Sequence, residues 1–455
     1  MILRWWPVLL AWLAMLSLLS GAAAEGPQFT VLTNEFAGPP LVGYGMEMSP
    51  YLTAPNAGQP VGNLDDLGRK LNTLAPQHVR IFVRTDWWQP GNEQIRDSFV
   101  RTCQLAQAAG ATINVTLWTG WEGNPAQASS EMAGLLKDLI VNRSLTAVRY
   151  VTLQNEVNST KITMEQYNAF YRMFDGDLRK NGIRDKIQIV GGDLVRTRQA
   201  DWLWDLATNL APVCDGHSVH IYWEYTQGTD AIRRLRGIAA VPDAFPAQER
   251  RPLYITEFGV RGKDWQKPGK DPGVYEDGTP ILQTGIAALQ VGWLMTEATR
   301  RGFVATVQWE GYDMAYGKRP MHYGIMGEPG EGWPLRPSYQ VLRLFTHTIA
   351  PGWRALQVEG DSTNVALAAV CGTNGEMTVM AVNHSKVEQT MSVAKLPADR
   401  VFQRIFWGAT EADLLQARDD VTGAGGLLKL TLPPESLTAL TDRADVVKNL
   451  GIGSP

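Results

Sequence analysis

The chain has 455 residues, with 42 Lys and Arg against 46 Asp and Glu and a formal net charge of −4. Its charges do not run in blocks, which excludes the electrostatic footprint of a nucleic-acid-binding protein or of a basic membrane-surface protein. Three widely separated cysteines, Cys103, Cys214 and Cys371, cannot form a disulfide framework, so we expect buried free thiols. The length allows two or three domains, one of which can be large.

The amino terminus has the pattern of an export signal. Arg4 precedes an apolar run over 5–19, and small residues occupy 22–24. This run is shorter than the roughly 20 residues of a membrane-spanning helix, and no later segment stays apolar for that length. We therefore expect a signal peptide over 1–24, a secreted or periplasmic mature protein, and no stable membrane insertion. An uncleaved signal that acts as an anchor is the alternative.

Between residues 41 and 349, short β-rich runs alternate with helix-length segments. The eight runs are apolar almost throughout, as expected of parallel strands buried on both faces. They cover 41–48, 79–84, 112–118, 150–156, 187–193, 218–222, 253–258 and 304–310. Helical patterns cover 94–109, 129–142, 163–181, 197–211 and 280–301, with a last helix ending near 349. This α/β alternation predicts a parallel sheet, and eight units over about 300 residues match a closed (β/α)8 TIM barrel.

The pattern changes after residue 349. Short alternating runs at 365–370, 377–383, 388–393, 401–407 and 428–432 are separated by turns and predict a β-sandwich over 350–443. The segment 25–40 precedes the barrel, and we interpret its run at 29–33 as a further strand of that sandwich. Residues 444–455 are interpreted as a polar tail.

Two of the predicted barrel strands end in glutamate. Glu156 follows Asn155 at the end of the fourth strand, and Glu257 lies near the end of the seventh. A charged residue at the end of a buried strand is costly unless it faces a polar site. The carboxyl ends of the strands are also where such barrels carry their functional groups. Either glutamate alone is more often a solvated loop residue, but the pair indicates a site.

These motifs resemble a known group of enzymes. Asn-Glu at 155–156 and Thr-Glu-Phe-Gly at 256–259 are similar to the strand-four and strand-seven motifs of the clan A retaining glycoside hydrolases, which include families 5, 30 and 39. Arg-Pro-Ser-Tyr at 336–339 and Leu-Pro-Pro-Glu-Ser-Leu-Thr at 432–438 resemble the barrel exit and the last sandwich strand of the xylosidase-like and glucanase-like members. The chain differs at Val157, where many of those enzymes have proline.

The resemblance implies a role for each matching residue. Glu156 would be the general acid/base, Glu257 the nucleophile, and Asn155 the partner of the sugar's 2-hydroxyl. Arg80 matches an arginine near the nucleophile, and Tyr222 a hydrogen-bonding tyrosine. His220 lies two residues before Tyr222, on the same strand face. Two carboxyl groups about 5–5.5 Å apart leave no room for a water between them, which favours a covalent intermediate and retention of configuration.

Tryptophan is abundant, with 16 in the chain, and several follow predicted strands. By the same resemblance, Trp309 would be the sugar platform beneath the bond that is cleaved. Trp88, Trp118, Trp121 and Trp223 are candidates for further sugar subsites, because apolar ring faces stack on sugars. Core packing is the alternative for each of them.

Other polar residues allow weaker interpretations. Glu47, Asp193 and Glu310 also end predicted strands and are candidates for binding hydroxyl groups. His217 and His220 suggest a metal site, but residues three apart on a strand point to opposite faces and cannot share one ion. The sequence therefore predicts neither a metal nor a cofactor.

These observations predict a retaining glycoside hydrolase that cleaves the β-glycosidic bonds of a polysaccharide, for example a bacterial exopolysaccharide. Its expected partner is a polysaccharide or oligosaccharide and not a nucleic acid, and we expect a monomer. One alternative is a carbohydrate-binding protein on the same fold that does not hydrolyse its ligand. A transglycosylase is another, because it would use the same residues.

Overall fold

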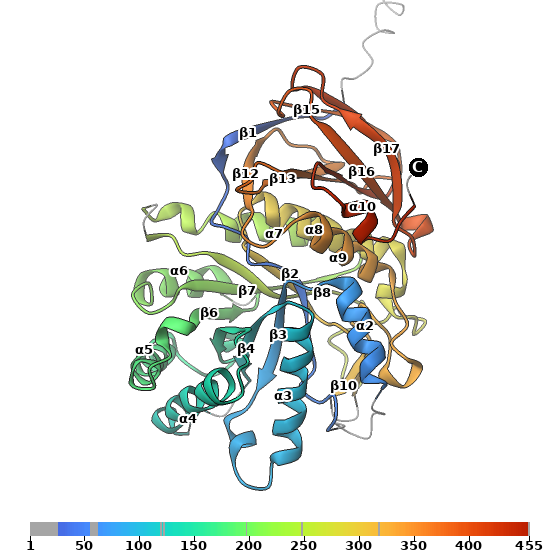
Figure 1. Ribbon diagram of the computed structural model, residues 1–455. Helices are drawn as coiled ribbons and strands as arrows, with labels where there is room; N and C mark the ends of the chain where they lie inside the picture. Colours follow the sequence, from blue (N-terminus) through green and yellow to red (C-terminus); the bar gives the residue numbers. More distant parts are fainter. Residues whose placement is uncertain are drawn as a thin grey trace, which may run out of the picture.

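The computed structural model describes residues 26–54, 62–118, 121, 123–196, 198–246, 249–316 and 319–453. The signal predicted over 1–24 lies outside these residues. The chain forms a β/α barrel and a β-sandwich that rests against it (Figure 1). Among the described residues, no helix is both long and apolar enough to span a membrane.

The barrel is closed by eight strands in chain order, each parallel to its neighbours. They are β2 (Gly43–Glu47), β3 (His78–Val83), β4 (Thr112–Leu117), β5 (Val148–Leu153), β6 (Gln188–Leu194), β7 (Gly216–Glu224), β8 (Leu253–Arg261) and β9 (Ala305–Gln308). Each strand corresponds to one predicted run, so the (β/α)8 barrel is confirmed. Strands of this kind are buried on both faces, which is why their sequences are apolar almost without interruption.

Helices form the outer layer of the barrel (Figure 1). They are α2 (Leu64–Leu74), α3 (Glu93–Ala108), α4 (Pro125–Lys137), α5 (Met164–Lys180), α6 (Gln199–Asn209), α7 (Gly228–Ala239), α8 (Gly285–Arg300) and α9 (Pro337–Thr348). Local signals fix their starts: Asn63 caps α2, and Thr163 and Gln166 form a capping box at α5. Helices α2 and α7 are additional to those that the sequence pattern indicated.

The sandwich is built from one connected set of nine strands in the order β17-β16-β19-β14-β13-β12-β1-β15-β18. Their bounds are β1 (Gln28–Phe36), β12 (Arg354–Glu359), β13 (Val365–Cys371), β14 (Met377–Asn383), β15 (Gln389–Ala394), β16 (Val401–Gly408), β17 (Gln416–Thr422), β18 (Leu428–Leu432) and β19 (Ser436–Thr441). The carboxyl-terminal sandwich is thus confirmed. The amino-terminal strand β1 pairs with β12 on one side and with β15 on the other.

The sandwich is held to the barrel by α8 and α9, which lie between the two parts (Figure 1). Trp293 of α8 stacks on His384, with ring centroids 3.9 Å apart. A separate apolar cluster fills the sandwich interior. Cys103 and Cys214 are buried and Cys371 is partly exposed, and all three are free thiols.

Candidate active site

Asn155 and Glu156 leave the barrel just beyond the end of β5. The strand ends at Leu153, earlier than the predicted 156, because Gln154 and Glu156 take left-handed φ angles of 69° and 50°. Such angles are uncommon for residues other than glycine and tend to occur at functional sites. They turn Glu156 toward the middle of the barrel end, where its side chain keeps 29% exposure.

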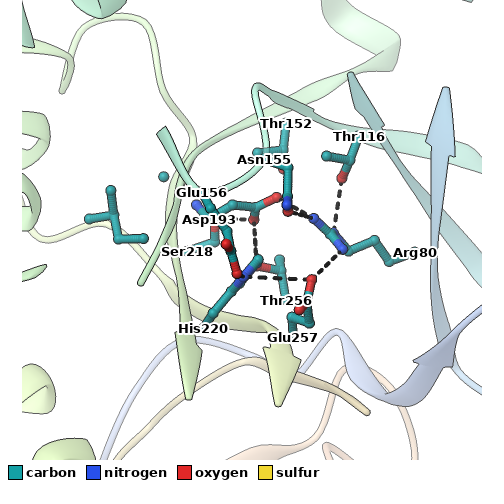
Figure 2. Close-up of polar contacts among 12 residues, drawn as sticks. Arg80, Thr116, Thr152, Asn155, Glu156, Asp193, Ser218, His220, Thr256 and Glu257 are labelled. Carbon is teal, nitrogen blue, oxygen red and sulfur yellow. Dashed lines mark hydrogen bonds and ion pairs between the residues drawn. The ribbon is translucent and has the colours of Figure 1, made fainter. Parts of the chain in front are cut away.

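Arg80 of β3 lies at the centre of the site, and Figure 2 shows it together with its partners Thr116, Asn155, Asp193 and Glu257. It is fully buried, and each of its nitrogens has a partner. Nε donates to Thr116, Nη1 to Glu47 and to Glu257, and Nη2 to Asn155 and to Asp193, at 2.5–3.0 Å. A guanidinium has five donors in one rigid plane, and here all five are used. Side chains from several barrel strands are therefore fixed by one cation.

Glu257 of β8 is held at both carboxylate oxygens. Oε2 accepts from Nη1 of Arg80 at 2.9 Å, and Oε1 accepts a short hydrogen bond from the hydroxyl of Tyr222. Gly259 makes room for the tyrosine ring, because a Cβ there would lie 2.9 Å from a ring carbon of Tyr222. The glutamate side chain is only 6% exposed, so its orientation is strongly constrained.

The two glutamates face each other across His220 of β7. Nδ1 of His220 lies 3.3 Å from Oε1 of Glu156 and 3.6 Å from Oε2 of Glu257. One ring nitrogen of His220 and one carboxylate oxygen from each glutamate all lie within 4.8 Å of one another. This is the spacing expected of a nucleophile and a proton donor in a retaining glycosidase. Barrel closure has therefore brought together two carboxyl groups that are far apart in the sequence.

The charge on His220 is set by these neighbours. Burial acts to lower its pKa, but the charges of Glu257 and Asp193 and hydrogen bonds to Asp193 and Glu156 raise the pKa to about 10. The same atoms could hold a metal ion by spacing alone. A protonated imidazole has no free lone pair and repels a cation, so the arrangement suits a proton better than a metal.

The pKa of Glu156 is the result of opposing effects. Burial acts to raise it, but the hydrogen bond and charge of His220 and the charges of Arg261 and Arg80 lower it overall. Glu156 is therefore ionised while His220 carries the proton. Because the two groups are in contact, they titrate as a unit, and the proton can move between them when their surroundings change.

Three further acids lie under the site. Asp193 binds Arg80 and accepts hydrogen bonds from Ser218 and Thr256. Against the cost of burial, the charges of Arg80 and His220 hold the pKa of Asp193 far below its usual range. The sequence pattern had suggested Asp193, Glu47 and Glu310 as ligands for hydroxyl groups. All are completely buried, so they cannot contact a substrate in this structure.

Glu47 and Glu310 differ from Asp193 in the direction in which their pKa values are shifted. Burial raises the pKa of both well above the usual range; the charge of Arg80 opposes this at Glu47, and the charge of Glu47 adds to it at Glu310. Neither carboxylate oxygen of Glu310 has a hydrogen-bond partner among the described residues, nor does Oε1 of Glu47. Of the two, Glu47 keeps an ion pair with Arg80 through Oε2.

An aromatic wall stands beside the charged groups. Trp118 stacks on Phe82 with ring centroids 5.2 Å apart, and Trp309 meets the same ring edge-on at 5.8 Å. Tyr323 joins the cluster, and Tyr222 packs against it. The structure thus brings Trp118 and Trp309 to the site. Trp118 is partly exposed and Trp309 is 6% exposed, and their role as sugar supports stays a prediction.

The other three tryptophans predicted as sugar subsites make packing contacts in the structure. Trp88 donates to Asp138 and packs edge-on against a ring of α3. Trp121 is 3% exposed and stacks on Phe170 of α5 at 4.3 Å. Trp223 is 5% exposed and donates to a glutamine of α8. Trp121 and Trp223 therefore fill space between strands and helices, and their assignment to subsites is corrected. Trp88 is partly exposed, and its assignment stays a prediction.

Some residues of the site were not identified from the sequence. Phe82 and Arg261 lie on the same strands as Arg80 and Glu257, two and four positions further along. Alternate residues of a strand share a face, so the even spacing from Arg80 and Glu257 could have predicted that Phe82 and Arg261 also face the site. Thr256 and Ser218 gave none, because their contact with Asp193 depends on the pairing of distant strands.

No family model matches this sequence, and no curated protein matches it either. Solved structures do match. A GH30 endoxylanase from Clostridium papyrosolvens C71 is 14% identical, covers 92% of this chain and 100% of its own, and has a TM-score of 0.65. The catalytic domain of GH30 xylanase C from Talaromyces cellulolyticus is 13% identical over 91% and 99%, with a TM-score of 0.67. A GH51 arabinofuranosidase from Xanthomonas axonopodis pv. citri is 14% identical over 91% and 99%, with a TM-score of 0.66.

These similarities extend over both the barrel and the sandwich. At such low identity they show the shared fold, and the fold predicted from the resemblance to clan A glycoside hydrolases is confirmed. What this chain does with that fold must be argued from its own site.

Proposed function

We propose that this protein is a retaining glycoside hydrolase that cleaves β-linked polysaccharides or oligosaccharides by double displacement. One observation carries the proposal: one carboxylate oxygen of Glu156, just beyond the end of β5, and one of Glu257, on β8, lie within 4.8 Å of each other at the carboxyl end of a closed barrel. The more exposed of the two, Glu156, suits the proton donor, because the leaving group must remain in contact with solvent.

In the first step, a carboxylate oxygen of Glu257 attacks the anomeric carbon. The bond from that carbon to the glycosidic oxygen breaks, and the oxygen takes a proton from Glu156. The products are a covalent glycosyl ester on Glu257 and a free alcohol end of the glycan. Arg80 and Tyr222 hold both nucleophile oxygens, so little reorientation is needed before attack.

The proton for this step comes from His220. In the free site His220 is protonated and Glu156 is ionised, with 3.3 Å between Nδ1 and Oε1. A bound sugar excludes water from Glu156 and raises the free energy of its charged form. The proton then moves from Nδ1 of His220 to Oε1 of Glu156, and the total charge of the three groups does not change.

In the second step, the ionised Glu156 takes a proton from water as the water oxygen attacks the anomeric carbon. The ester bond to Glu257 breaks, and the sugar leaves with its original configuration. A sugar hydroxyl in place of water gives transglycosylation by the same residues. Product analysis with and without an added acceptor glycan distinguishes these two outcomes.

The test is to trap the intermediate. Activated 2-deoxy-2-fluoro β-glycosides form the ester quickly and release it slowly. With a panel of β-sugars, we expect one of them to add a single glycosyl mass to the peptide that contains Glu257, and the Glu257→Gln variant to take up none. Absence of any adduct, with glycan binding intact, would favour the carbohydrate-binding protein instead.

We also propose that the protein acts outside the cytoplasm as a secreted or periplasmic enzyme. The support is the basic residue, apolar run and small residues at 1–24. The intact mass of the protein recovered from an expressing bacterium tests this. A mature chain that begins at Glu25 in the periplasm or medium is expected, and a full-length chain in the cytoplasm contradicts it.

A further inference from the structure

Arg261, the last residue of β8, is a stacked cation at the edge of the candidate site. Its guanidinium carbon lies 3.7 Å from the ring centroid of Tyr222 and 4.4 Å from that of Trp265. Two aromatic contacts fix the plane of the group. The residue is partly exposed, so the plane is positioned at the boundary between the site and solvent.

The strand places this cation on the reacting side of the barrel. Glu257, Gly259 and Arg261 are alternate residues of β8 and share one face. The glycine in the middle leaves the space that the ring of Tyr222 fills. That ring contacts Glu257 through its hydroxyl and Arg261 through its face, so the guanidinium is one aromatic ring away from the nucleophile.

Arg261 also differs from its cationic neighbours in having no acidic partner. Arg80 forms ion pairs with three carboxylates, and Lys263, two residues further along the chain, pairs with Glu276 at 3.1 Å. Over the described parts of the chain, no carboxylate oxygen lies within 4.0 Å of the guanidinium of Arg261, and its Nε is buried without a hydrogen-bond partner. Glu156 and Glu257 attract it only from a longer range.

A guanidinium with fixed faces and no carboxylate within ion-pair distance, beside the hydroxyl of Tyr323, is suited to a planar anion. Its edge N–H groups match the two oxygens of a carboxylate, and the resulting pair of hydrogen bonds is strong and directional. When a glycan covers the site and displaces water, an unpaired cation becomes costly, and a carboxylate on the glycan removes that cost. In sugars such a carboxylate belongs to a uronic acid unit.

We propose that Arg261 recognises a carboxylate of the substrate and that the glycan is acidic, with a uronic acid unit next to the bond that is cleaved. This inference rests on the proposed function, because it specifies the substrate class of the same site.

The test uses the Glu257→Gln variant of the full chain, which binds glycans without cleaving them. Oligosaccharides from three β-linked glucuronic-acid-containing glycans are each compared with the carboxyl-reduced form, in which a hydroxymethyl group replaces the carboxylate. For at least one pair, we expect the acidic member to bind 10-fold or more tightly at low salt. Adding Arg261→Gln should remove this preference, and Arg261→Lys should restore only part of it.

Lys263→Gln is the matched control, because it removes a neighbouring positive charge that already has an acidic partner. It should keep the preference, and thermal unfolding of every variant should be unchanged within a few degrees. The inference is overturned if no acidic member binds better than its reduced form. It is equally overturned if Arg261→Gln weakens both members alike. A shift in the pH profile of hydrolysis by the single Arg261→Gln variant, with Glu257 intact, would then assign to Arg261 a general electrostatic effect on Glu156.

Failure of the proposed function would look different. An Arg261-dependent preference for the acidic glycan, together with no hydrolysis of any glycan by the unaltered protein, would contradict the reaction and leave the recognition intact.

Discussion

The two ends of the barrel each contain a buried histidine of β7, and the pKa values of these two histidines are shifted in opposite directions. His217 and His220 lie three residues apart on β7 and are 2% and 1% exposed. Burial and the charge of Arg251 lower the pKa of His217 to about 4. Burial also acts on His220, but carboxylates raise its pKa to about 10. The partners of a buried histidine, and not its burial, therefore decide whether it is charged.

The amino-terminal end of the barrel shows that a hollow does not by itself make a site. His78 lies there beside Tyr150, and burial lowers the pKa of the histidine to about 3. A surface hollow of about 820 Å³ is lined in part by Tyr150, Gln188 and Tyr254. The paired carboxyl groups of Glu156 and Glu257 lie instead at the carboxyl-terminal end. Convergent charges locate the chemistry better than the size of an opening does.

Among the substitutions that compare the two ends of the barrel, the largest expected effect is the loss of kcat when the proposed nucleophile Glu257 is replaced. Glu257→Gln keeps the shape of the side chain but removes the attacking charge, so kcat should fall on the order of 10⁴-fold or more. Glu297→Gln is the control, because Glu297 is an equally buried acid on α8 that pairs with Arg236 and Arg301 away from the site. Its kcat should stay within about 2-fold of the parent. Comparable losses in both variants would contradict the assignment.

The next effect is on stability. Arg80→Met leaves the buried carboxylates of Glu47 and Asp193 without their cation, and the free energy of unfolding should fall by about 3–5 kcal/mol. Arg179→Met removes an exposed ion pair with Asp175 and should leave the urea midpoint unchanged. Equal urea midpoints for the two variants would show that the site network does not contribute to folding.

The sequence predicted the barrel well because its central strands are continuous apolar runs. It was less accurate where strands end. The fourth strand was expected to reach Glu156, but the left-handed angles of Gln154 and Glu156 end it at Leu153. Edge strands with polar sequences were also missed: β17 contains Arg-Asp-Asp and is mostly exposed, so it lacks the apolar pattern of a buried strand.

Site residues could be predicted where a single segment of the sequence shows their position, and could not be predicted where their role depends on the pairing of distant strands. Glu156 and Glu257 lie at or near the ends of predicted apolar runs, and that position is visible in one segment at a time. The error at Trp223 was avoidable, because adjacent residues of a strand face opposite sides and Tyr222 already faces the site. The burial of Asp193 under Arg80 was not predictable, because it depends on the register of separate strands.

A smaller effect on rate is expected for the tyrosine that holds the nucleophile. Tyr222→Phe removes a hydrogen bond to a charged group, a loss of about 1.5–3 kcal/mol, so kcat/KM should fall roughly 10-fold to 100-fold. Tyr254→Phe is the matched variant at the amino-terminal end, where the ring packs near His78 and Tyr150. It should leave kcat/KM unchanged, and a similar loss in both variants would argue against a specific role for Tyr222.

The pH dependence of stability should also differ between the two histidines of β7. The folded pKa of His220, about 10, lies above the ordinary histidine value of 6.5, so its contribution to stability is fully present below pH 6.5 and is lost as the pH rises through 10. The folded pKa of His217, about 4, lies below that value, so its contribution is present above pH 6.5 and is lost as the pH falls through 4. His220→Gln should therefore flatten the alkaline side of a plot of unfolding free energy against pH, and His217→Gln the acidic side. Nitrogen chemical shifts of the two rings provide the direct measurement, and a shared titration midpoint would remove the difference between the two ends of the barrel.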